Sequence, residues 1–213
     1  MPKRIFDVIS SISGLIILSP LILIISILVK TTSKGPIIYK GIRVGLHGKP
    51  FKMFKFRSMV ENADKIGGSS TAGDDPRLTE TVKFLRRHKL DEIPQLINVL
   101  KGDMSLVGPR PEVQYYVDTM TEEEKNTILS TKPGITDWAS IWDLHEEEVL
   151  RGSNNPEKDY LEKILPEKIR LQIKYVNERT FFKDISIIFS TIFRVFKQPK
   201  RPEHTKKILK KSC

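Results

Sequence analysis

The feature that most constrains this chain is an apolar run of about 22 residues, Val8–Val29, which contains no charged side chain. As a helix, a run of this length reaches across a bilayer core of roughly 30 Å. The pair Ser19-Pro20 stands at its middle. Proline removes a backbone donor and clashes with the carbonyl four residues earlier, and the serine hydroxyl can bond to a carbonyl freed in this way. The sequence therefore predicts a membrane element that is broken at this pair.

Basic residues flank the run on both sides, with Lys3 and Arg4 before it and Lys30 and Lys34 after it. Basic flanks favour the cytoplasmic side of a membrane. A hairpin that enters and leaves on one side satisfies this preference at both ends, whereas a kinked transmembrane helix satisfies it at one. On the residues alone both stay open. A cleaved signal peptide is disfavoured, because the run is long and no small-residue cleavage motif follows it.

The composition indicates one domain with a polar body. The chain has 213 residues, a net charge of +10 and a pI of about 9.6. Such a balance suits nucleic acid, an anionic membrane surface or phosphorylated substrates, and the apolar run favours the membrane. The mean hydropathy of −0.27 shows that the rest of the chain is polar. The single cysteine, Cys213, excludes a disulfide framework and favours a reducing compartment.

Short patterns in the body predict a β-hairpin and a helix. The β-leaning runs Ile37–Tyr39 and Phe51–Phe56 are separated by glycines and a proline, which is typical of a hairpin. The glycine-rich stretch Asn62–Asp75 is predicted to be a surface loop of the kind that often forms a lid. Apolar residues at helical spacing over Leu90–Leu100, followed by Gly102, predict a helix with a glycine cap.

The C-terminal half is predicted to be helical. Thr121–Glu124 matches a capping box, and Pro156 and Pro166 suit first turns of helices. Phe182–Lys197 carries an apolar stripe, which is read either as an interfacial helix in the headgroup region or as a core-facing helix. The basic tail 199–213 would bind anionic lipid beside a membrane, or be solvated.

Two adjacent carboxylates, Asp91 and Glu92, are the first candidates for chemistry. Pro94 fits the start of a helix, so the pair lies at or just before its N-terminus. An ionised aspartate is available as a nucleophile. Adjacent carboxylates repel unless a cation lies between them, so Mg²⁺ with Asp91 and Glu92 as ligands is expected beside a diphosphate. The alternative is that both acids only cap the helix.

Five cations are candidates for binding phosphate. Lys55 and Arg57 alternate along a strand-like segment, so both are predicted to point to one face. Arg86 lies five residues before the acid pair, Arg110 lies between two prolines that fix the backbone, and Arg77 is a further candidate. Converging arginines can hold a diphosphate and stabilise developing charge. For any one of them, the alternative is a solvated surface charge.

At these residues the chain resembles a known family. The segment Lys55–Met59, the stretch KLDEIPQLINVLKGDMSLVGPRPE over Lys89–Glu112 and the hydrophobic N-terminus are similar to the bacterial sugar transferases, the small monotopic phosphoglycosyl transferases. The motifs cover roughly Lys3–Gly134, and weaker similarity runs to about Phe196. We therefore expect an α+β, mostly helical fold with a short β-hairpin and interfacial amphipathic helices.

The resemblance implies a topology in four parts. A re-entrant membrane helix-hairpin over residues 1–34, broken at Ser19-Pro20, precedes a small cytosolic catalytic domain over 35–180. An interfacial amphipathic helix over 181–198 and the basic tail 199–213 follow. The implied location is the bacterial inner membrane, with the catalytic domain facing the cytoplasm.

The resemblance also implies a reaction. Asp91 would attack the β-phosphate of a UDP-sugar and release UMP, and a polyprenol phosphate would then take the phosphosugar from the aspartate. Glu92 would assist through proton handling or Mg²⁺ ligation, which stay open. The residues implied to position phosphates are Lys55, Arg57, Arg86 and Arg110. The expected partners are the two substrates and the cytoplasmic leaflet, with no nucleic acid and a possible homo-oligomer.

One segment departs from the family pattern. Many members read close to KPGITGWAQVNGR, whereas here Asp137, Ser140 and Trp142 break it. If this segment shapes the sugar or nucleotide pocket, the usual sugar is not a safe assumption. Trp138 and Trp142 either stack on a base or sugar, or pack as a helical pair.

Two rival functions are weighed against this one. A membrane-tethered, non-catalytic scaffold or nucleic-acid-binding protein would bind DNA or RNA in a salt-sensitive way through the basic tail. The clustering of cations near carboxylates and the lack of a recognised nucleic-acid module weigh against it. A hydrolase using the same acid pair would release phosphate or a sugar phosphate in place of UMP.

Overall fold

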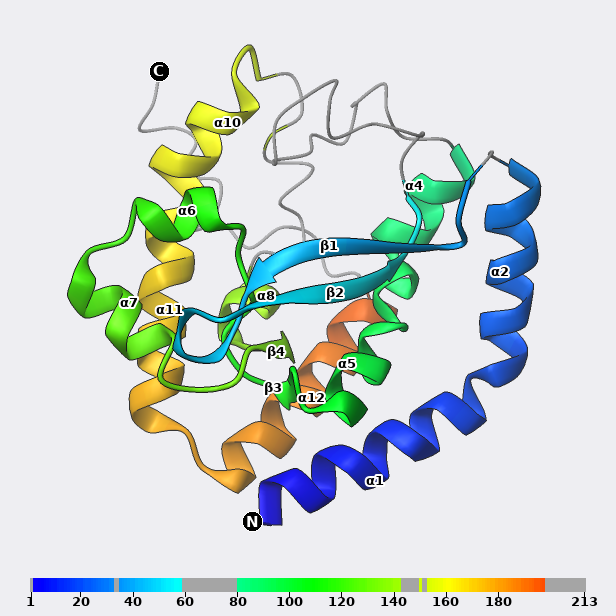
Figure 1. Cartoon of the computed structure of the whole chain (residues 1–213), viewed down its shortest axis with the longest axis horizontal. Coiled ribbons are helices and arrows are strands. Elements are labelled where there is room, and N and C mark those ends of the chain that lie inside the picture. Colours follow the sequence, from blue (N-terminus) through cyan, green and yellow to red (C-terminus); the bar gives the residue numbers. More distant parts are fainter. Residues whose placement is uncertain (1, 33–34, 59–79, 143–149, 151–152, 198–213) are drawn as a thin grey trace.

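The computed structural model describes residues 2–32, 35–58, 80–142, 150 and 153–197 (Figure 1). The helices up to the middle of the chain are α1 (Pro2–Ile17), α2 (Ser19–Thr32), α4 (Glu80–Arg87), α5 (Gln95–Lys101), α6 (Gln114–Asp118) and α7 (Glu122–Ile128). The later helices are α8 (Trp138–Trp142), α10 (Pro156–Asp159), α11 (Leu165–Glu178) and α12 (Phe181–Lys197). The short turns are η1 (Leu46–Gly48), η2 (Leu90–Glu92) and the π-helical η3 (Tyr160–Ile164). The strands are β1 (Ile38–Val44), β2 (Pro50–Phe56), β3 (Ser105–Val107) and β4 (Gly134–Thr136).

The predicted break in the apolar run is confirmed. Helix α1 ends at Ile17, α2 begins at Ser19, and the two are bent by 64°. Pro20 has no N–H to donate to the carbonyl of Ile16, four residues earlier. The hydroxyl of Ser19 donates to that carbonyl oxygen at 2.8 Å. The serine therefore satisfies the acceptor that the proline leaves open, which makes the break stable without water.

The α1–α2 pair presents its apolar side chains outward. Within the described ranges no single helix is long and apolar enough to cross a bilayer, and the bent pair meets that test only as a unit, by length and composition. The exposed aliphatic residues of the pair include Ile5, Ile9, Ile12, Ile16, Leu23, Ile24 and Ile27. In contrast, Asp7 and Ser11 are buried against the body. Figure 1 shows α1 along one edge of the body and α2 rising beside it.

The β-hairpin is confirmed, and a second strand pair is added to it. β1 and β2 are antiparallel, with Ile38 opposite Phe56 and Val44 opposite Pro50. β3 and β4 form a short parallel pair that the sequence did not indicate. The described part is thus mostly helical with small strand pairs, which confirms the α+β class.

Helix α5 lies between α1 and the β1–β2 hairpin, since it packs against both α1 and β2. Its buried side chain Asn98 accepts from the N–H of Phe54 at 2.9 Å and donates to the carbonyl of Lys52 at 2.8 Å. Gly102 ends the helix with φ 87°, as predicted for a glycine cap. These contacts fix α5 relative to β2.

The predicted helix ends are confirmed at several positions. Thr121 forms the capping box of α7, and Pro156 and Pro166 lie in the first turns of α10 and α11. On α12, Phe182 and Phe189 are exposed as an interfacial stripe requires. Asp184, which lies off that stripe, is buried, and Tyr175 donates to its Oδ1 at 2.7 Å. Ile187 on α12 is fully buried. The predicted loop 62–75 and the predicted tail 199–213 lie outside the described residues.

Candidate active site

Asp91 and Glu92 lie in the turn η2, immediately before α5. The turn starts at Lys89, whose φ of 54° is in the left-handed region, and the Glu92 N–H donates to the Lys89 carbonyl at 3.2 Å. Pro94 is the cap residue of α5, so the pair precedes the helix as predicted. Only 4% of Asp91 and 7% of Glu92 is exposed. Both carboxylates therefore face the interior, where the turn packs against α4 and β2.

Glu92 is ion-paired with two of the predicted cations. Lys55 Nζ lies 3.1 Å from Glu92 Oε1, and Arg110 Nη1 lies 3.0 Å from Oε2. Arg110 Nη2 also donates to Oε1, so the guanidinium binds the carboxylate in a bidentate manner. Burial alone would raise the pKa of Glu92, but Arg110 and Lys55 hold this pKa well below its ordinary value. Glu92 is thus a permanently charged anchor that gathers two cations.

Asp91 has the opposite environment. Burial raises its pKa, and Lys55 opposes that shift. Its buried Oδ1 has no hydrogen-bond partner in the part of the chain that the structure describes. A buried polar atom without a partner costs free energy, so such atoms usually receive a ligand, water or ion. Of the two neighbouring acids, Asp91 is the one with a carboxylate oxygen that no described group already holds in a hydrogen bond.

Lys55 and Arg57 do not reach the same partners. Lys55 is directed to Glu92, and burial lowers its pKa against the opposing effect of that carboxylate. The buried Arg57 donates from Nη1 to the Pro36 carbonyl at 2.6 Å and from Nη2 to the Val29 carbonyl at 3.2 Å. These bonds place the Arg57 guanidinium at the end of α2, where it links the α1–α2 pair to the start of the body.

Arg86 and Arg77 are the other two cations that the sequence predicts for the site. Arg86 lies in the last turn of α4, before Lys89, and its charge is one of the weaker influences that lower the pKa of Asp91. Arg77 lies outside the described residues. The described structure therefore brings Lys55 and Arg110 together on the acid pair, with Arg86 nearby.

The Arg110 turn depends on two glycines. The Gly108 N–H donates to the Thr136 carbonyl at 3.1 Å, and the Gly134 N–H donates to the Pro109 carbonyl at 3.0 Å. A Cβ built on Gly134 would lie 2.1 Å from the Gly108 nitrogen, so a larger residue cannot fit. The unpredicted β3–β4 pair therefore sets the start of the turn that presents Arg110.

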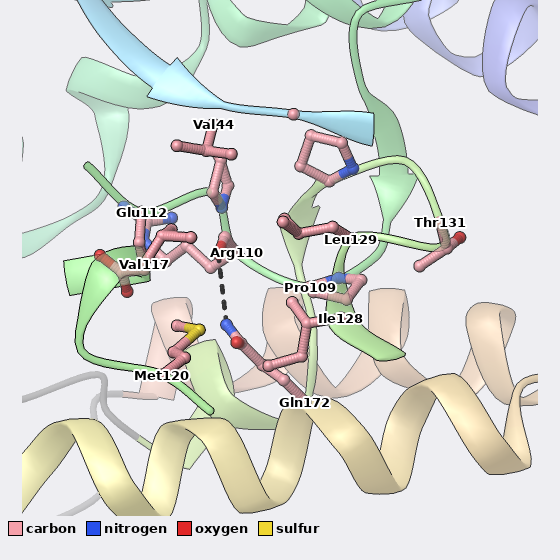
Figure 2. Close-up of a pocket in the computed structure, with 13 residues that line it drawn as sticks. Val44, Pro109, Arg110, Glu112, Val117, Met120, Ile128, Leu129, Thr131 and Gln172 are labelled. Carbon is pink, nitrogen blue, oxygen red and sulfur yellow. Dashed lines mark hydrogen bonds between the residues drawn. The ribbon is translucent and has the colours of Figure 1, made fainter. Parts of the chain in front are cut away.

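A pocket lies against this turn, and Pro109, Arg110 and Pro111 are part of its lining (Figure 2). Asp91 and Glu92 do not line it, and Arg110 is the member that it shares with the acid site. Its walls are mostly apolar and come from Val44, Gly45, Pro109, Arg110, Pro111, Glu112, Val117, Met120, Ile128, Leu129, Thr131, Pro133 and Gln172. The pocket shows that the turn is backed by side chains of α6, α7 and α11.

The atypical segment is explained in part by a local bond. Asp137 is fully buried, and its Oδ1 accepts from both the N–H and the hydroxyl of Ser140 at 2.7 Å. Burial raises the pKa of Asp137, and the Ser140 bonds oppose the shift. Trp138 and Trp142 pack against two different apolar clusters, which fits the packing interpretation. Asp137 and Ser140 thus act as a pair at the start of α8.

Oxygen donors for a metal are present only in part. No three His, Cys, Asp or Glu side chains within the described ranges gather in a way that could hold an ion. Mg²⁺ commonly takes one or two carboxylates together with substrate phosphates. The Asp91 carboxylate fits that role, because it still has an oxygen without a partner among the described residues, whereas both oxygens of Glu92 are already held by cations. The residues therefore suit a Mg²⁺ that binds through Asp91 and a bound diphosphate.

Sequence reasoning missed the side chains that hold these elements in place. Asn98, which lies within the predicted helix but carries no prediction of its own, bonds α5 to β2. Lys3 and Arg4 were read as membrane flanks, yet Lys3 Nζ donates to the Val107 carbonyl at 3.0 Å and Arg4 Nη2 to the Leu100 carbonyl at 2.8 Å. The helical neighbours of Asn98, Gln95 and Lys101, are polar, so the sequence carries no local signal for the Asn98 bonds.

Comparison with known proteins confirms the family resemblance that the sequence motifs indicate. The family model described as bacterial sugar transferase matches residues 1–198, and the chain belongs to that family.

Individual relatives agree with this assignment. A UDP-glucose:undecaprenyl-phosphate glucose-1-phosphate transferase of Escherichia coli (strain K12) is 40% identical over 91% of this chain. An undecaprenyl-phosphate galactose phosphotransferase of Salmonella typhimurium is 38% identical over 89% of it. The chain spans about 40% of the length of the former and 39% of the latter. It spans 92% of the exopolysaccharide production protein PSS of Rhizobium leguminosarum bv. phaseoli, at 35% identity over 89% of this chain.

Proposed function

We propose that this protein transfers a sugar 1-phosphate from a UDP-sugar to a polyprenol phosphate, as the first membrane step of glycan assembly. The family membership and the names of the relatives support this reaction over a non-catalytic scaffold. The observation that carries the proposal is the unpartnered Oδ1 of Asp91, buried beside the Lys55–Glu92–Arg110 ion pairs. A carboxylate oxygen that is not tied up in a hydrogen bond and lies beside fixed cations suits the nucleophile of a phosphoryl transfer.

In the first step, an ionised Asp91 oxygen attacks the β-phosphorus of the UDP-sugar. A bond forms between that oxygen and phosphorus, and the bond from phosphorus to the bridging oxygen breaks. UMP leaves with the electron pair, and the sugar phosphate stays on Asp91 as an acyl phosphate. Lys55 favours the ionised form of Asp91 against the effect of burial.

In the second step, a phosphate oxygen of the polyprenol phosphate attacks the same phosphorus. The bond to Asp91 breaks, the carboxylate is regenerated, and polyprenyl-diphosphate-sugar leaves. Lys55 and Arg110 lie where they can balance the charge that builds on the phosphoryl oxygens in both steps. Glu92 fixes these two cations, and its lowered pKa argues against proton carriage.

A divalent cation is part of the proposal. Mg²⁺, bound through Asp91 and the donor diphosphate, would neutralise phosphate charge and ease the departure of UMP. Glu92 contributes through Lys55 and Arg110 in place of direct ligation, since its oxygens are occupied.

The hairpin is proposed to be re-entrant in the cytoplasmic leaflet of the bacterial inner membrane. Three observations support this: the 64° bend, the outward aliphatic residues of α1 and α2, and the exposed aromatic stripe of α12 that includes Phe182 and Phe189. Phe6 and Phe181 contact edge to face at 5.4 Å between centroids, so α1 and α12 meet at their N-terminal ends. An interfacial site reaches a water-soluble donor and a lipid acceptor together.

The reaction is tested by measuring UMP. Purified protein in nanodiscs is incubated with undecaprenyl phosphate, Mg²⁺ and a panel of UDP-glucose, UDP-galactose and their N-acetylated forms. Release of UMP that depends on the lipid acceptor is expected with at least one donor, and Asp91→Asn is expected to abolish it. Asp118→Asn, the same change at an exposed position on α6, should leave it unchanged. Full activity in Asp91→Asn would contradict the assignment of the nucleophile, and release of inorganic phosphate would favour a hydrolase.

The topology is tested with cysteines at Pro2 and Thr32, which are exposed at the two ends of the hairpin. In a Cys213→Ser background, an impermeant maleimide should label neither position in intact spheroplasts and both after lysis. Labelling of one position in intact spheroplasts would mean that the element crosses the membrane.

A further inference from the structure

The Arg110 turn is held from behind by a side chain of α11. Gln172 is 1% exposed, and its Nε2 donates to the backbone carbonyl of Arg110 at 3.2 Å (Figure 2). The Arg110 side chain reaches Glu92, with Nη1 lying 3.0 Å from Oε2. The backbone of Arg110 is thus bonded to α11, while its guanidinium is bonded to the acid site.

A second bond from α11 reaches the same turn through Glu112. Lys168, which is 3% exposed, lies one helical turn before Gln172, and its Nζ is 3.0 Å from Glu112 Oε1. The hydroxyl of Tyr160 accepts from Lys168 at 2.8 Å and donates to Glu112 Oε1 at 3.1 Å. The carbonyl of Glu112 accepts from the N–H of Val44 at 3.0 Å.

A buried ion pair of this kind is a poor way to gain stability. Removing a lysine and a glutamate from water costs several kcal/mol per ion, and well-packed apolar residues often do as well. The network instead fixes the position of the turn that carries Arg110. Prolines on both sides restrict the φ angles of the turn, so its main freedom is to shift as a unit. The bonds from Gln172 and Lys168 oppose such a shift.

We propose that Gln172 is a positioning residue for Arg110, and that Lys168 supports it through Glu112. Together they hold the turn where the guanidinium reaches both oxygens of Glu92, the neighbour of Asp91 in the turn η2. This deepens the proposed function and rests on it for the catalytic readout. A misplacement of about 1 Å near reacting groups can cost 100-fold in rate, so a helix outside the acid site can control its activity.

The proposal is tested by a double-mutant cycle on UMP release. Gln172→Met removes the donor with little change of volume and is expected to lower kcat about tenfold, the equivalent of one lost hydrogen bond, with KM changed less than twofold. Arg110→Ala removes the group that Gln172 positions. In an Arg110→Ala background, Gln172→Met should therefore have no further effect. Lys174→Met, on the exposed face of α11, serves as the control and should match the wild type.

A second readout does not depend on the reaction. Phenylglyoxal modifies accessible arginines, and mass spectrometry of the peptide that carries Arg110 gives its rate of modification. Gln172→Met should raise that rate about fivefold, in line with the loss of about one hydrogen bond, while Lys174→Met should not. If Gln172→Met folds poorly, Gln172→Asn takes its place. It keeps an amide but is one methylene shorter, and it should raise the rate of Arg110 modification to a similar extent.

The outcomes separate the two proposals. Losses that multiply in the double variant, or an unchanged Arg110 modification rate in folded protein, would overturn the positioning role. If the wild type releases no UMP with any donor, the proposed function fails, and the modification rate alone still decides whether Gln172 holds Arg110.

Discussion

Replacing Glu92 with glutamine removes the charge that gathers the two cations of the site. The side chain keeps its shape, but Lys55 Nζ and the Arg110 guanidinium, now 3.0–3.1 Å from a neutral amide, lose their counter-charge. Both would turn to Asp91, the remaining carboxylate of the turn. Glu92→Gln should therefore destabilise the fold and weaken Asp91 as a nucleophile at the same time.

The expected loss of stability follows from the burial of the partners. Removing one member of a buried ion pair typically costs about 3–5 kcal/mol. The side chains of Lys55 and Arg110 keep 19% and 21% of their exposure, so water recovers part of this. We expect a loss of about 2–3 kcal/mol, which for a chain of this size lowers the melting temperature by about 5–10 °C. The loss in kcat should be about 100-fold or more, as for removal of one group that orders transition-state charge.

The assay is thermal unfolding of wild type and Glu92→Gln in nanodiscs, at pH 7 and in acid. The folded-state pKa of Glu92 is depressed below the unfolded value of 4.5. Its contribution is therefore complete well above pH 4.5 and is lost as the pH falls through the lower folded-state pKa. The gap between the two melting temperatures should narrow in acid. Lys55→Met combined with Glu92→Gln should recover part of the stability but not the activity, because Arg110 still faces a neutral amide. Equal melting temperatures at pH 7, or a gap that widens in acid, would refute this account of the site.

Three further predictions address the scaffold and the metal. Gly134→Ala should cost several kcal/mol and abolish UMP release, because its Cβ would meet the Gly108 backbone at 2.1 Å, whereas Gly48→Ala, with open space around it, should cost about 1 kcal/mol in thermal unfolding. Arg4→Met should lower the melting temperature by several degrees, since Arg4 caps the carbonyls at the end of α5, while Lys30→Met at an exposed position should not. EDTA should abolish UMP release and added Mg²⁺ should restore it; activity that survives EDTA would remove the metal from the mechanism.

The sequence predicted the local structure well where a residue imposes its own geometry. The Ser19-Pro20 break, the Thr121 capping box and the left-handed Gly102 each depend on neighbours within four residues, so the chain alone specifies them. The β3–β4 pair joins segments about 30 residues apart through two glycines, and nothing local in either segment marks the other. Parallel pairing of this kind is a property of tertiary packing.

At the site, the sequence predicted the residue types but not how they divide the work. Asp91 and Glu92 are neighbours of the same charge, and only the fold shows that Arg110 and Lys55 bind one and leave an oxygen of the other open. Arg57 was grouped with Lys55 by alternation along a strand. Its guanidinium instead reaches the carbonyl of Val29 near the end of α2 and the carbonyl of Pro36 just before β1, which alternation along the strand does not reveal.

Helix α5 connects the proposed membrane element to the proposed nucleophile. At its C-terminal end, the carbonyls of Val99 and Leu100 accept from Arg4 of α1, and at its N-terminal end the turn η2 carries Asp91. Seven residues of helix span about 10 Å, so one short rigid segment sets the distance between the two. Asn98, in the same helix, fixes it to the strand that carries Lys55. The α1–α2 pair therefore cannot shift along the body without moving α5 and the acid pair.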